Sequence, residues 1–159
     1  MAEELDMIKA KEVYDTIVSM MDAIGWKYEK HEEDLVIKSG AQGDDLPMDL
    51  LLIVDPKSQI VQLISRMPFN VPEDKRFDAA VAICVANYGL KDGSFDYDIN
   101  DGEIRFRLTS SYRESILSKE LFVYMIGVSI GTIDQYNDKF FMLSKGVMSI
   151  QQFIEQENQ

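Results

Sequence analysis

The first two dozen residues carry apolar side chains at the spacing of an amphipathic helix. Apolar residues recur at alternating steps of three and four from Met7 to Ile24, which places them along one side of a helix. Carboxylates at positions 3, 4 and 6 suit the positive end of the helix dipole. Gly25 is typical of the position that follows a helix end. The pattern therefore predicts a helix over residues 3–24.

Short apolar runs separated by turn residues follow, and they predict four strands. The segments WKYEKHE and DLVIKSG flank an acidic turn, AQGDDLP is predicted as a loop, and MDLLLIVD and IVQLISRMPF flank a turn led by Pro56. The last two runs are the most continuously apolar, as is typical of strands covered on both faces. We therefore expect them at the centre of an antiparallel sheet.

A second helix is predicted from Pro72, because proline is favoured at the first helical position, to Gly89. Its apolar stripe is predicted to consist of Phe77, Val81, Cys84 and Tyr88. Residues 79–86 are apolar nearly all round, which is typical of a helix covered on more than one side. One side can be covered by the sheet and the other by another helix or a second subunit. The candidate face for self-association or a partner comprises Phe77, Val81, Ile83, Val85 and Tyr88.

The segment FDYDINDGEIRFRL, residues 95–108, is rich enough in carboxylates to suggest a calcium loop. A loop that started at Asp96 would place Asp101 where an EF-hand needs glycine. It would also place Arg107 where the loop needs a bidentate glutamate. The calcium interpretation fails at the two positions that matter most.

The alternative is a β-hairpin with the Asp-Gly pair at residues 101–102 as its tip. The apolar face would then hold the pairs Ile99–Ile104, Tyr97–Phe106 and Phe95–Leu108. On the other face Asp98 would meet Arg105, and Asp96 would meet Arg107. Opposite charges directly across a ladder are favourable. We therefore predict the hairpin.

A long helix is predicted after Ser118, which suits the N-cap position. Its apolar stripe comprises Ile126, Ile133, Tyr136, Phe140, Leu143 and Val147. Gly127 and Gly131 share one side of this helix, and we expect them to let another backbone approach closely. A short final helix is predicted over residues 149–155.

The predicted order is helix, four strands, helix, two strands, helix. This order indicates the α+β class, with an antiparallel sheet and flanking helices. A chain of 159 residues suits a single domain, residues 1–159, that can bury a sufficient core without disulfides.

The formal net charge of −12 argues against two classes of partner. Nucleic-acid binding relies on Lys and Arg to neutralise phosphates, and an anionic membrane surface also attracts cations. The longest uncharged run near the C-terminus, residues 121–133, is short of the roughly 20 residues that span a bilayer. The acidic N-terminus lacks the basic start of a signal peptide.

Cys84 is the only cysteine, and it lies in an apolar run. A thiol in such a run is typically a small core residue. A lone cysteine also fits a reducing compartment, so we expect a cytoplasmic protein.

Histidine pairs and the common nucleotide-binding loops are missing from the sequence. His31 is the only histidine, so no His–His metal pair exists, and neither a Walker loop nor GxGxxG is present. The cluster HEED, residues 31–34, is interpreted as a solvated turn. We therefore predict no catalytic residue, cofactor or metal. The alternative is a small-molecule sensor or enzyme with a pocket between sheet and helices, in which Arg66, Asn70 or Tyr88 would converge.

Several short motifs follow one another in a recognisable order over residues 26–146. They are Leu46-Pro47-Met48, Pro68-Phe69, Val71-Pro72, Asn87-Tyr88, and Gly93-x-Phe95-x-Tyr97-Asp98 before Asp101-Gly102. In this order they resemble the YbjN-like proteins, which are called bacterial sensory transduction regulators. The resemblance implies the fold of type III secretion chaperones and often a dimer. It carries over no catalytic residue, because none is established for that family.

The resemblance also implies a mode of action. Secretion chaperones bind extended segments of other proteins along apolar grooves and sheet edges. We therefore expect a non-enzymatic interaction module, chaperone-like or regulatory. We expect it to be a homodimer with a protein partner that the sequence does not name.

Overall fold

The chain begins with helix α1, Ala2–Ala23, in a computed structural model that describes all 159 residues. The middle of its apolar stripe is buried as predicted, with Tyr14, Ile17 and Met21 almost inaccessible to solvent, whereas Met7 and Ile24 at the two ends of the stripe are exposed. After the helix, Gly25 has a φ of 71°, and the N–H of Trp26 donates to the carbonyl of Met21. Glycine permits this left-handed helix end. The predicted helix is confirmed to within one residue at each end.

Six strands form one antiparallel sheet in the order β1-β2-β3-β4-β6-β5. They are β1 Tyr28–His31, β2 Val36–Gln42, β3 Pro47–Asp55, β4 Ile60–Asn70, β5 Ser94–Asp98 and β6 Glu103–Ser111. The apolar strands β3 and β4 lie at the centre, as predicted. The loop predicted over residues 41–47 is shorter than expected, because the β2–β3 ladder continues outward to the Gln42–Pro47 pair.

The predicted hairpin is present as β5–β6, but its register is shifted by two residues. Phe95 lies opposite Phe106, and Asp96 lies opposite Arg105. The turn takes up four residues, 99–102, instead of two. An even shift keeps each strand residue on its predicted face of the sheet, so the apolar face survives the change of register. The predicted Ile99–Ile104 pair is wrong, because Ile99 lies in the turn and is exposed, and Tyr97 takes its place opposite Ile104.

Asp98 explains why the turn is longer than predicted. Its carbonyl accepts from the N–H of Gly102 at 2.8 Å, and its carboxylate accepts from the N–H of Asn100 at 2.9 Å. The predicted pairing of Asp98 with Arg105 is therefore wrong, because the Asp98 carboxylate is used within the turn. Asp96 instead pairs with Arg105 and Arg107.

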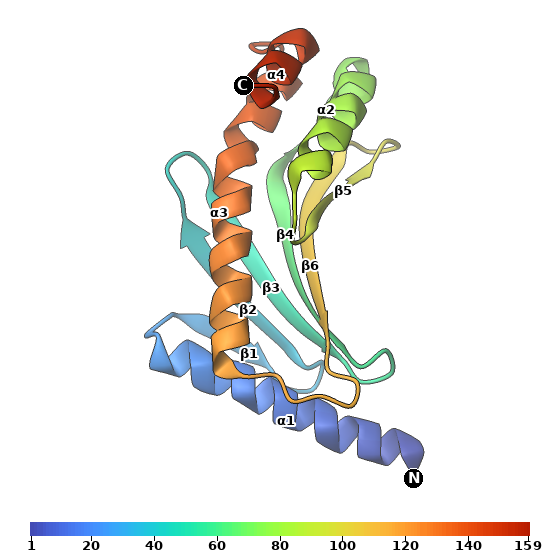
Figure 1. The fold of residues 1–159 in the computed structure, drawn as a ribbon, viewed down its shortest axis with the longest axis vertical. Helices are drawn as coiled ribbons and strands as arrows, with labels where there is room; N and C mark the ends of the chain where they lie inside the picture. Colours follow the sequence, from blue (N-terminus) through green and yellow to red (C-terminus); the bar gives the residue numbers. More distant parts are fainter.

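The helices cover one face of the sheet (Figure 1). The long helix α3, Lys119–Ser144, runs along this face, and α1 crosses one end of it. Helices α2, Arg76–Gly89, and α4, Ile150–Glu157, lie at the other end. The buried residues of β3 alternate with residues that are half-buried or exposed, as a sheet covered on one side requires. This is the predicted α+β arrangement, and none of its helices is both long and apolar enough to cross a membrane.

Helix α2 begins later than predicted. Pro72 precedes a short 3-10 helix, Glu73–Lys75, and the α-helix starts only at Arg76. The predicted starts of the later helices are confirmed by their caps. The Ser118 hydroxyl accepts from the N–H of Leu121 at 3.2 Å, and a reciprocal capping box begins α4.

The buried stripe of α3 agrees with the prediction at five of its six positions: Ile126, Ile133, Tyr136, Phe140 and Leu143. Val147 is the exception, because it lies beyond the helix end and is exposed. The expectation for Gly127 and Gly131 is also wrong, since no other segment lies near either residue. Both glycines face solvent.

Candidate functional site

Helix α2 packs on the rest of the molecule mainly through small side chains. Ala79, Ala82, Ile83 and Ala86 are its buried residues. The alanine side chains let the helix lie close to its neighbours, which are α3, α4 and β5. The buried side therefore holds the helix in place without using its aromatic residues.

The largest side chains of α2 point into solvent. The exposed fractions of Phe77, Val81 and Tyr88 are 80%, 45% and 96%, and Cys84 between them is also exposed. We call these four residues the α2 stripe. The prediction that Cys84 is a core residue is therefore wrong. Helical spacing defines such a stripe, but it does not decide which of two apolar sides meets the core.

The structure leaves three of the five residues of the predicted partner face exposed. Phe77, Val81 and Tyr88 belong to the α2 stripe, and Val85 is half-buried beside it. Ile83 is wrongly assigned to this face, because its side chain is buried in the core cluster. The exposed surface is thus narrower than predicted, and it includes Cys84.

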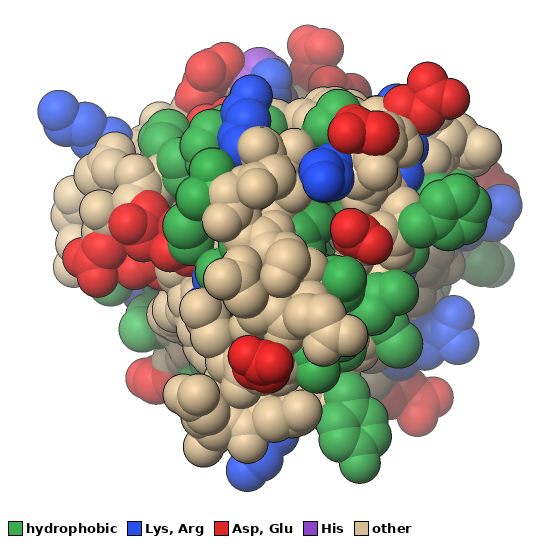
Figure 2. Space-filling view, turned by 90° about the horizontal axis from the view of Figure 1, so that it is seen from above, with side chains coloured by type: hydrophobic (Ala, Val, Ile, Leu, Met, Phe, Trp, Pro, Cys, Tyr) green, Lys and Arg blue, Asp and Glu red, His purple; other side chains and the backbone are tan.

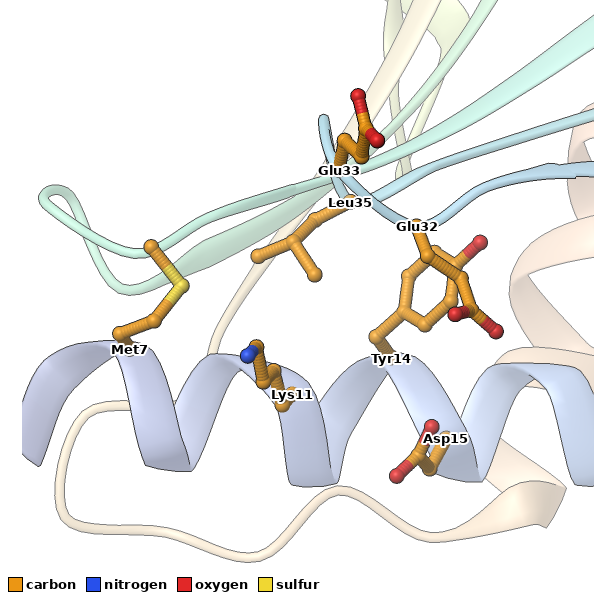
Figure 3. Close-up of a pocket in the computed structure, with 7 residues that line it drawn as sticks. All are labelled: Met7, Lys11, Tyr14, Asp15, Glu32, Glu33 and Leu35. Atoms are coloured by element: carbon orange, nitrogen blue, oxygen red, sulfur yellow. The ribbon is translucent and has the colours of Figure 1, made fainter.

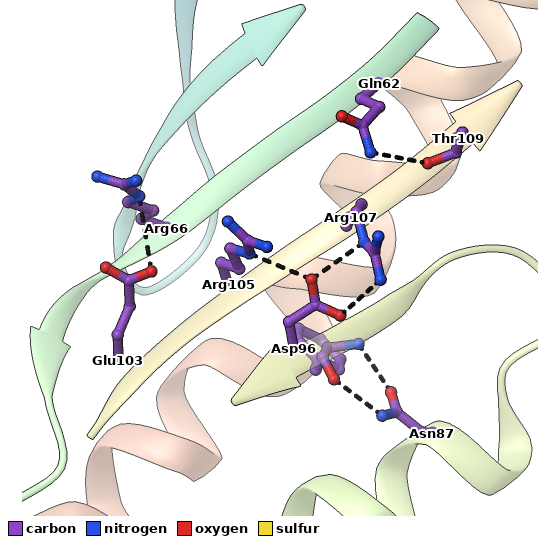
Figure 4. Close-up of polar contacts among 9 residues, drawn as sticks. Gln62, Arg66, Asn87, Asp96, Glu103, Arg105, Arg107 and Thr109 are labelled. Atoms are coloured by element: carbon purple, nitrogen blue, oxygen red, sulfur yellow. Dashed lines mark hydrogen bonds and ion pairs between the residues drawn. The ribbon is translucent and has the colours of Figure 1, made fainter. Parts of the chain in front are cut away.

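Asn87 fastens the C-terminal end of α2 to the edge strand β5. Its amide nitrogen donates to the Phe95 carbonyl at 2.9 Å, and its Oδ1 accepts from the Phe95 N–H at 2.8 Å (Figure 4). An edge strand otherwise presents such groups to any strand that could add to the sheet. Asn87 therefore holds the helix and also blocks this point of the edge. Sequence reasoning missed this role, because nothing local links residue 87 to residue 95.

Arg76 and Tyr97 fasten the other end of α2. The Arg76 guanidinium donates to the carbonyls of Asn100 and Val71 at 2.7 and 3.3 Å. The Tyr97 hydroxyl donates to the Arg76 carbonyl at 2.9 Å, and burial raises the pKa of this tyrosine. Both ends of the helix are therefore bound to the β5–β6 hairpin or the segment before the helix, and the α2 stripe is presented on a fixed support.

The end of the molecule that carries α2 and α4 shows hydrophobic side chains at its surface (Figure 2). They lie in several groups between single carboxylates and a few basic residues. Val147, in the segment between α3 and α4, is 71% exposed and adds to this apolar surface. Single exposed apolar residues are normal, but an aligned row on one helix is not.

A hollow of about 570 Å³ lies between α1 and the β1–β2 turn (Figure 3). Lys11 is the only cation in its lining, beside the carboxylates of Asp15, Glu32 and Glu33. Burial and then the charge of Glu32 raise the pKa of Tyr14 in its wall. The predicted turn of residues 31–34 forms part of the rim. Nowhere in the molecule do three or more His, Cys, Asp or Glu residues form a group that could hold a metal ion.

The residues considered for a small-molecule pocket lie apart. Arg66 projects from the face of the sheet that the helices leave open. The Asn70 side chain donates to the Asp101 carbonyl at 3.1 Å, and Tyr88 belongs to the α2 stripe. These three side chains therefore share no site between the sheet and the helices.

Comparison with known proteins agrees with this architecture. The sequence model of the YbjN family, described as "Putative bacterial sensory transduction regulator", matches residues 14–142. No curated protein matches the chain in sequence. Among solved structures, YbjN from E. coli, described as a putative transcription regulator, is similar with a TM-score of 0.60 and 12% identity, over 77% of this chain and 86% of that chain.

A second similar structure is the ExsC–ExsE complex, in which the structural neighbour is the type III secretion chaperone ExsC. The TM-score is 0.57 at 13% identity, and the match covers 81% of this chain and 93% of that chain. At these identities the likeness establishes the fold. The predicted fold, an antiparallel sheet with flanking helices like that of secretion chaperones, is confirmed.

Proposed function

The chain belongs to the YbjN family, and from this premise we propose that it is a non-enzymatic protein-interaction module, chaperone-like or regulatory, that forms homodimers in the cytoplasm. The observation that carries the proposal is the exposed α2 stripe. The family match and the fold shared with a chaperone support the general class of function. Because fold alone does not determine function, the surface itself provides the main argument.

The α2 stripe has the properties of an interface core. Phe77 and Tyr88 lie three turns apart on one helix, so the stripe is about 16 Å long at the helical rise per residue. Aromatic side chains dominate the binding energy of many protein interfaces. An aligned apolar surface of this kind is stabilised when another apolar surface covers it.

A second copy of the chain is the partner that we propose for the α2 stripe. None of its four residues is charged, so two copies can pack stripe against stripe about a two-fold axis despite the net charge of −12. In an antiparallel pair, Glu73 and Asp74 before one helix lie near Lys91 after the other. Salt screens the remaining repulsion, so the association should tighten as ionic strength rises.

The dimer leaves the sheet free for a different protein. The ExsC–ExsE complex is a precedent for binding of another protein by this fold. We extend that mode of binding to the present chain, with self-association through α2 and a protein partner elsewhere.

Light scattering over a dilution series tests the homodimer. We expect a mass of twice 18.2 kDa at high concentration and a lower mass on dilution. Added salt should shift the equilibrium toward the dimer, because it screens repulsion between two acidic chains. A mass of 18.2 kDa at every concentration and salt level would contradict the proposal.

Cys84 provides an internal probe of the contact, because it is the only cysteine and lies near the middle of the α2 stripe. In an antiparallel pair the two thiols lie near the two-fold axis, so a short bismaleimide should join two chains. The matched control is Cys84→Ser with Thr109→Cys, which moves the thiol to an exposed position on the sheet. Cross-linking of the control but not of the wild type would place the contact elsewhere.

A further inference from the structure

The sheet has one covered and one uncovered face. On β4, Val61, Leu63 and Met67 are buried on the side of the helices, whereas Ile64 and Arg66 face the other way. The same alternation of buried and less buried residues runs through β3 and β6. The helices lie on the first face (Figure 1). We call the second face, which no helix of the chain covers, the outer face.

A row of four side chains crosses the outer face, with one side chain from each of four neighbouring strands. The ladders pair Lys38 with Leu51, Leu51 with Ile64, and Ile64 with Arg107. Two half-buried apolar residues thus form the centre of the row, and a cation lies at each end. Neighbouring strands are about 4.8 Å apart, so the row is about 14 Å long. We call it the outer row.

The arginines around the outer row are arranged in a way that folding does not favour. Arg66 lies directly opposite Arg105 in the β4–β6 ladder, and like charges so placed destabilise a sheet. Arg105 and Arg107 share the carboxylate of Asp96, at 3.1 and 3.0 Å, whereas Arg66 has only Glu103 at 3.7 Å (Figure 4). Four cations, Lys38 and these three arginines, thus outnumber the three carboxylates near them, which belong to Asp49, Asp96 and Glu103. In a chain of net charge −12, a local excess of cations favours an acidic ligand.

The surface beside the outer row is hollowed. Lys38 and Arg66 line a depression of about 360 Å³ together with Leu51 and Ile64, and Asp49 supplies the one carboxylate of its lining. Apolar and cationic groups therefore meet in one place. A ligand that fills it must supply both an apolar side chain and carboxylates.

We propose that the outer face binds an extended acidic segment of a partner protein, in which Asp or Glu stands two positions before and two positions after an apolar residue. Alternate side chains of an extended segment point the same way, and residues four positions apart are separated by about 13 Å. This separation matches that of Lys38 and Arg107 across the outer row. The apolar residue then lies over Leu51 and Ile64, and Arg66 lies beside the segment.

This inference rests on the proposed function only because that function assigns a protein partner to the chain. The outer face and the α2 stripe are separate surfaces made of different elements. Dimerisation and peptide binding can therefore be measured independently, and one can fail without the other. A variant that dissociates the dimer is expected to bind the segment as the wild type does.

The test uses the full-length protein and a short fluorescein-labelled peptide with Glu, Leu and Glu at alternate positions and Ser between them. Fluorescence anisotropy measures binding, and the same peptide with Lys in place of Glu is the ligand control. We expect only the Glu peptide to bind, with an affinity that falls as salt is added. Absence of binding by the Glu peptide, or equal binding of both peptides, would overturn the proposal.

The double variant Lys38→Glu/Arg66→Glu locates the site. We expect it to weaken peptide binding by about tenfold or more, because it reverses two cations that line the depression. The matched control Lys11→Glu/Lys119→Glu makes the same change in net charge at exposed positions on helices α1 and α3, outside the sheet, and is expected to bind within about twofold of the wild type. Equal losses of peptide affinity in the two double variants would contradict the location of the binding site on the outer face. A change of solution mass in the first variant without a loss of peptide affinity would show a contact between copies instead.

Discussion

The two sides of helix α2 are built from opposite kinds of residue. Its buried side consists largely of alanines, Ala79, Ala82 and Ala86, whereas Phe77 and Tyr88 are exposed on the other side. A helix that serves only the fold of one chain normally buries its largest apolar residues. Close packing against α3, α4 and β5 accounts for the small residues on the inner side of α2. No such packing within the chain accounts for the exposed aromatic residues on its outer side.

The largest change in free energy is expected for self-association when the exposed side of α2 is altered. Phe77→Ser/Tyr88→Ser removes both aromatic rings of the α2 stripe and should weaken self-association by about 100-fold, or nearly 3 kcal/mol, because interface aromatics carry much of the binding energy. The stability of the monomer should change by less than about 0.5 kcal/mol, as is usual for exposed substitutions. Light scattering and urea denaturation measure the two quantities.

The control for this prediction is Ile99→Ser, which removes an exposed apolar side chain from the hairpin turn. Its solution mass should equal that of the wild type at every concentration. Unfolding of the double variant, with unchanged association of the fraction that stays folded, would show that the aromatic residues serve the fold and not an interface.

On the buried side of α2, substitution is expected to lower the stability of the fold. Ala82→Leu inserts a larger side chain where the alanine is completely buried, and overpacking of this kind costs about 1–3 kcal/mol. The exposed counterpart, Cys84→Leu, adds similar bulk to the outer side and should change the free energy of unfolding by less than about 0.5 kcal/mol. Urea denaturation compares the two variants. Equal effects of both would mean that the two sides of α2 do not differ in packing.

A smaller effect is expected where α2 meets the edge strand. Asn87→Ala leaves the N–H and carbonyl of Phe95 without their partner and should cost about 1–2 kcal/mol. Amide hydrogen exchange at Phe95 should accelerate as well. The control is Gln62→Ala, which removes an exposed hydrogen bond to Thr109 on the outer face and should have little effect. Unchanged exchange at Phe95 would argue that the edge is protected in another way.

The smallest effect concerns the buried aromatic cluster behind α2 and is confined to high pH. Burial and a hydrogen bond to Glu157 raise the pKa of Tyr136 far above its ordinary value. The unfolded tyrosine ionises near pH 10 and the folded one does not, so the unfolded state binds fewer protons above that pH and stability falls. One such group contributes a loss of at most about 1.4 kcal/mol per pH unit.

Urea denaturation at a pH below and a pH above 10 checks this prediction. Tyr136→Phe should lose less stability between the two conditions than the wild type does, even if it is less stable at neutral pH. Other tyrosines with raised pKa values, such as Tyr14 and Tyr112, remain in both proteins, so the difference isolates residue 136. Identical losses in the two proteins would show that Tyr136 does not carry the effect.

The β5–β6 hairpin shows which structural features the sequence predicts and which it does not. The alternation of residues identified both strands and the face of each side chain, because these depend on a period of two. The register was wrong by two residues, since Asp98 bonds within the turn and lengthens it. A two-residue and a four-residue turn place the strand side chains on the same faces, so the alternation of apolar and polar residues does not distinguish between them.

The candidate sites depend even more on distant contacts. Arg66 and Arg105 are unremarkable in their own strands, and only the β4–β6 ladder places them opposite each other. Likewise, Asn87 acquires its role only because the fold brings β5 to the end of α2. Neither arrangement can be recognised from the residues that neighbour it in the sequence.

The positions and types of the helices and strands followed from the chain itself, because apolar periodicity, caps and turn residues act over a few neighbouring positions. The α2 stripe was recognised in the same way, as a set of residues at helical spacing. Its direction was decided only by the tertiary structure. The alanine side of α2 fits closely against α3, α4 and β5, and this packing leaves the larger residues on the surface.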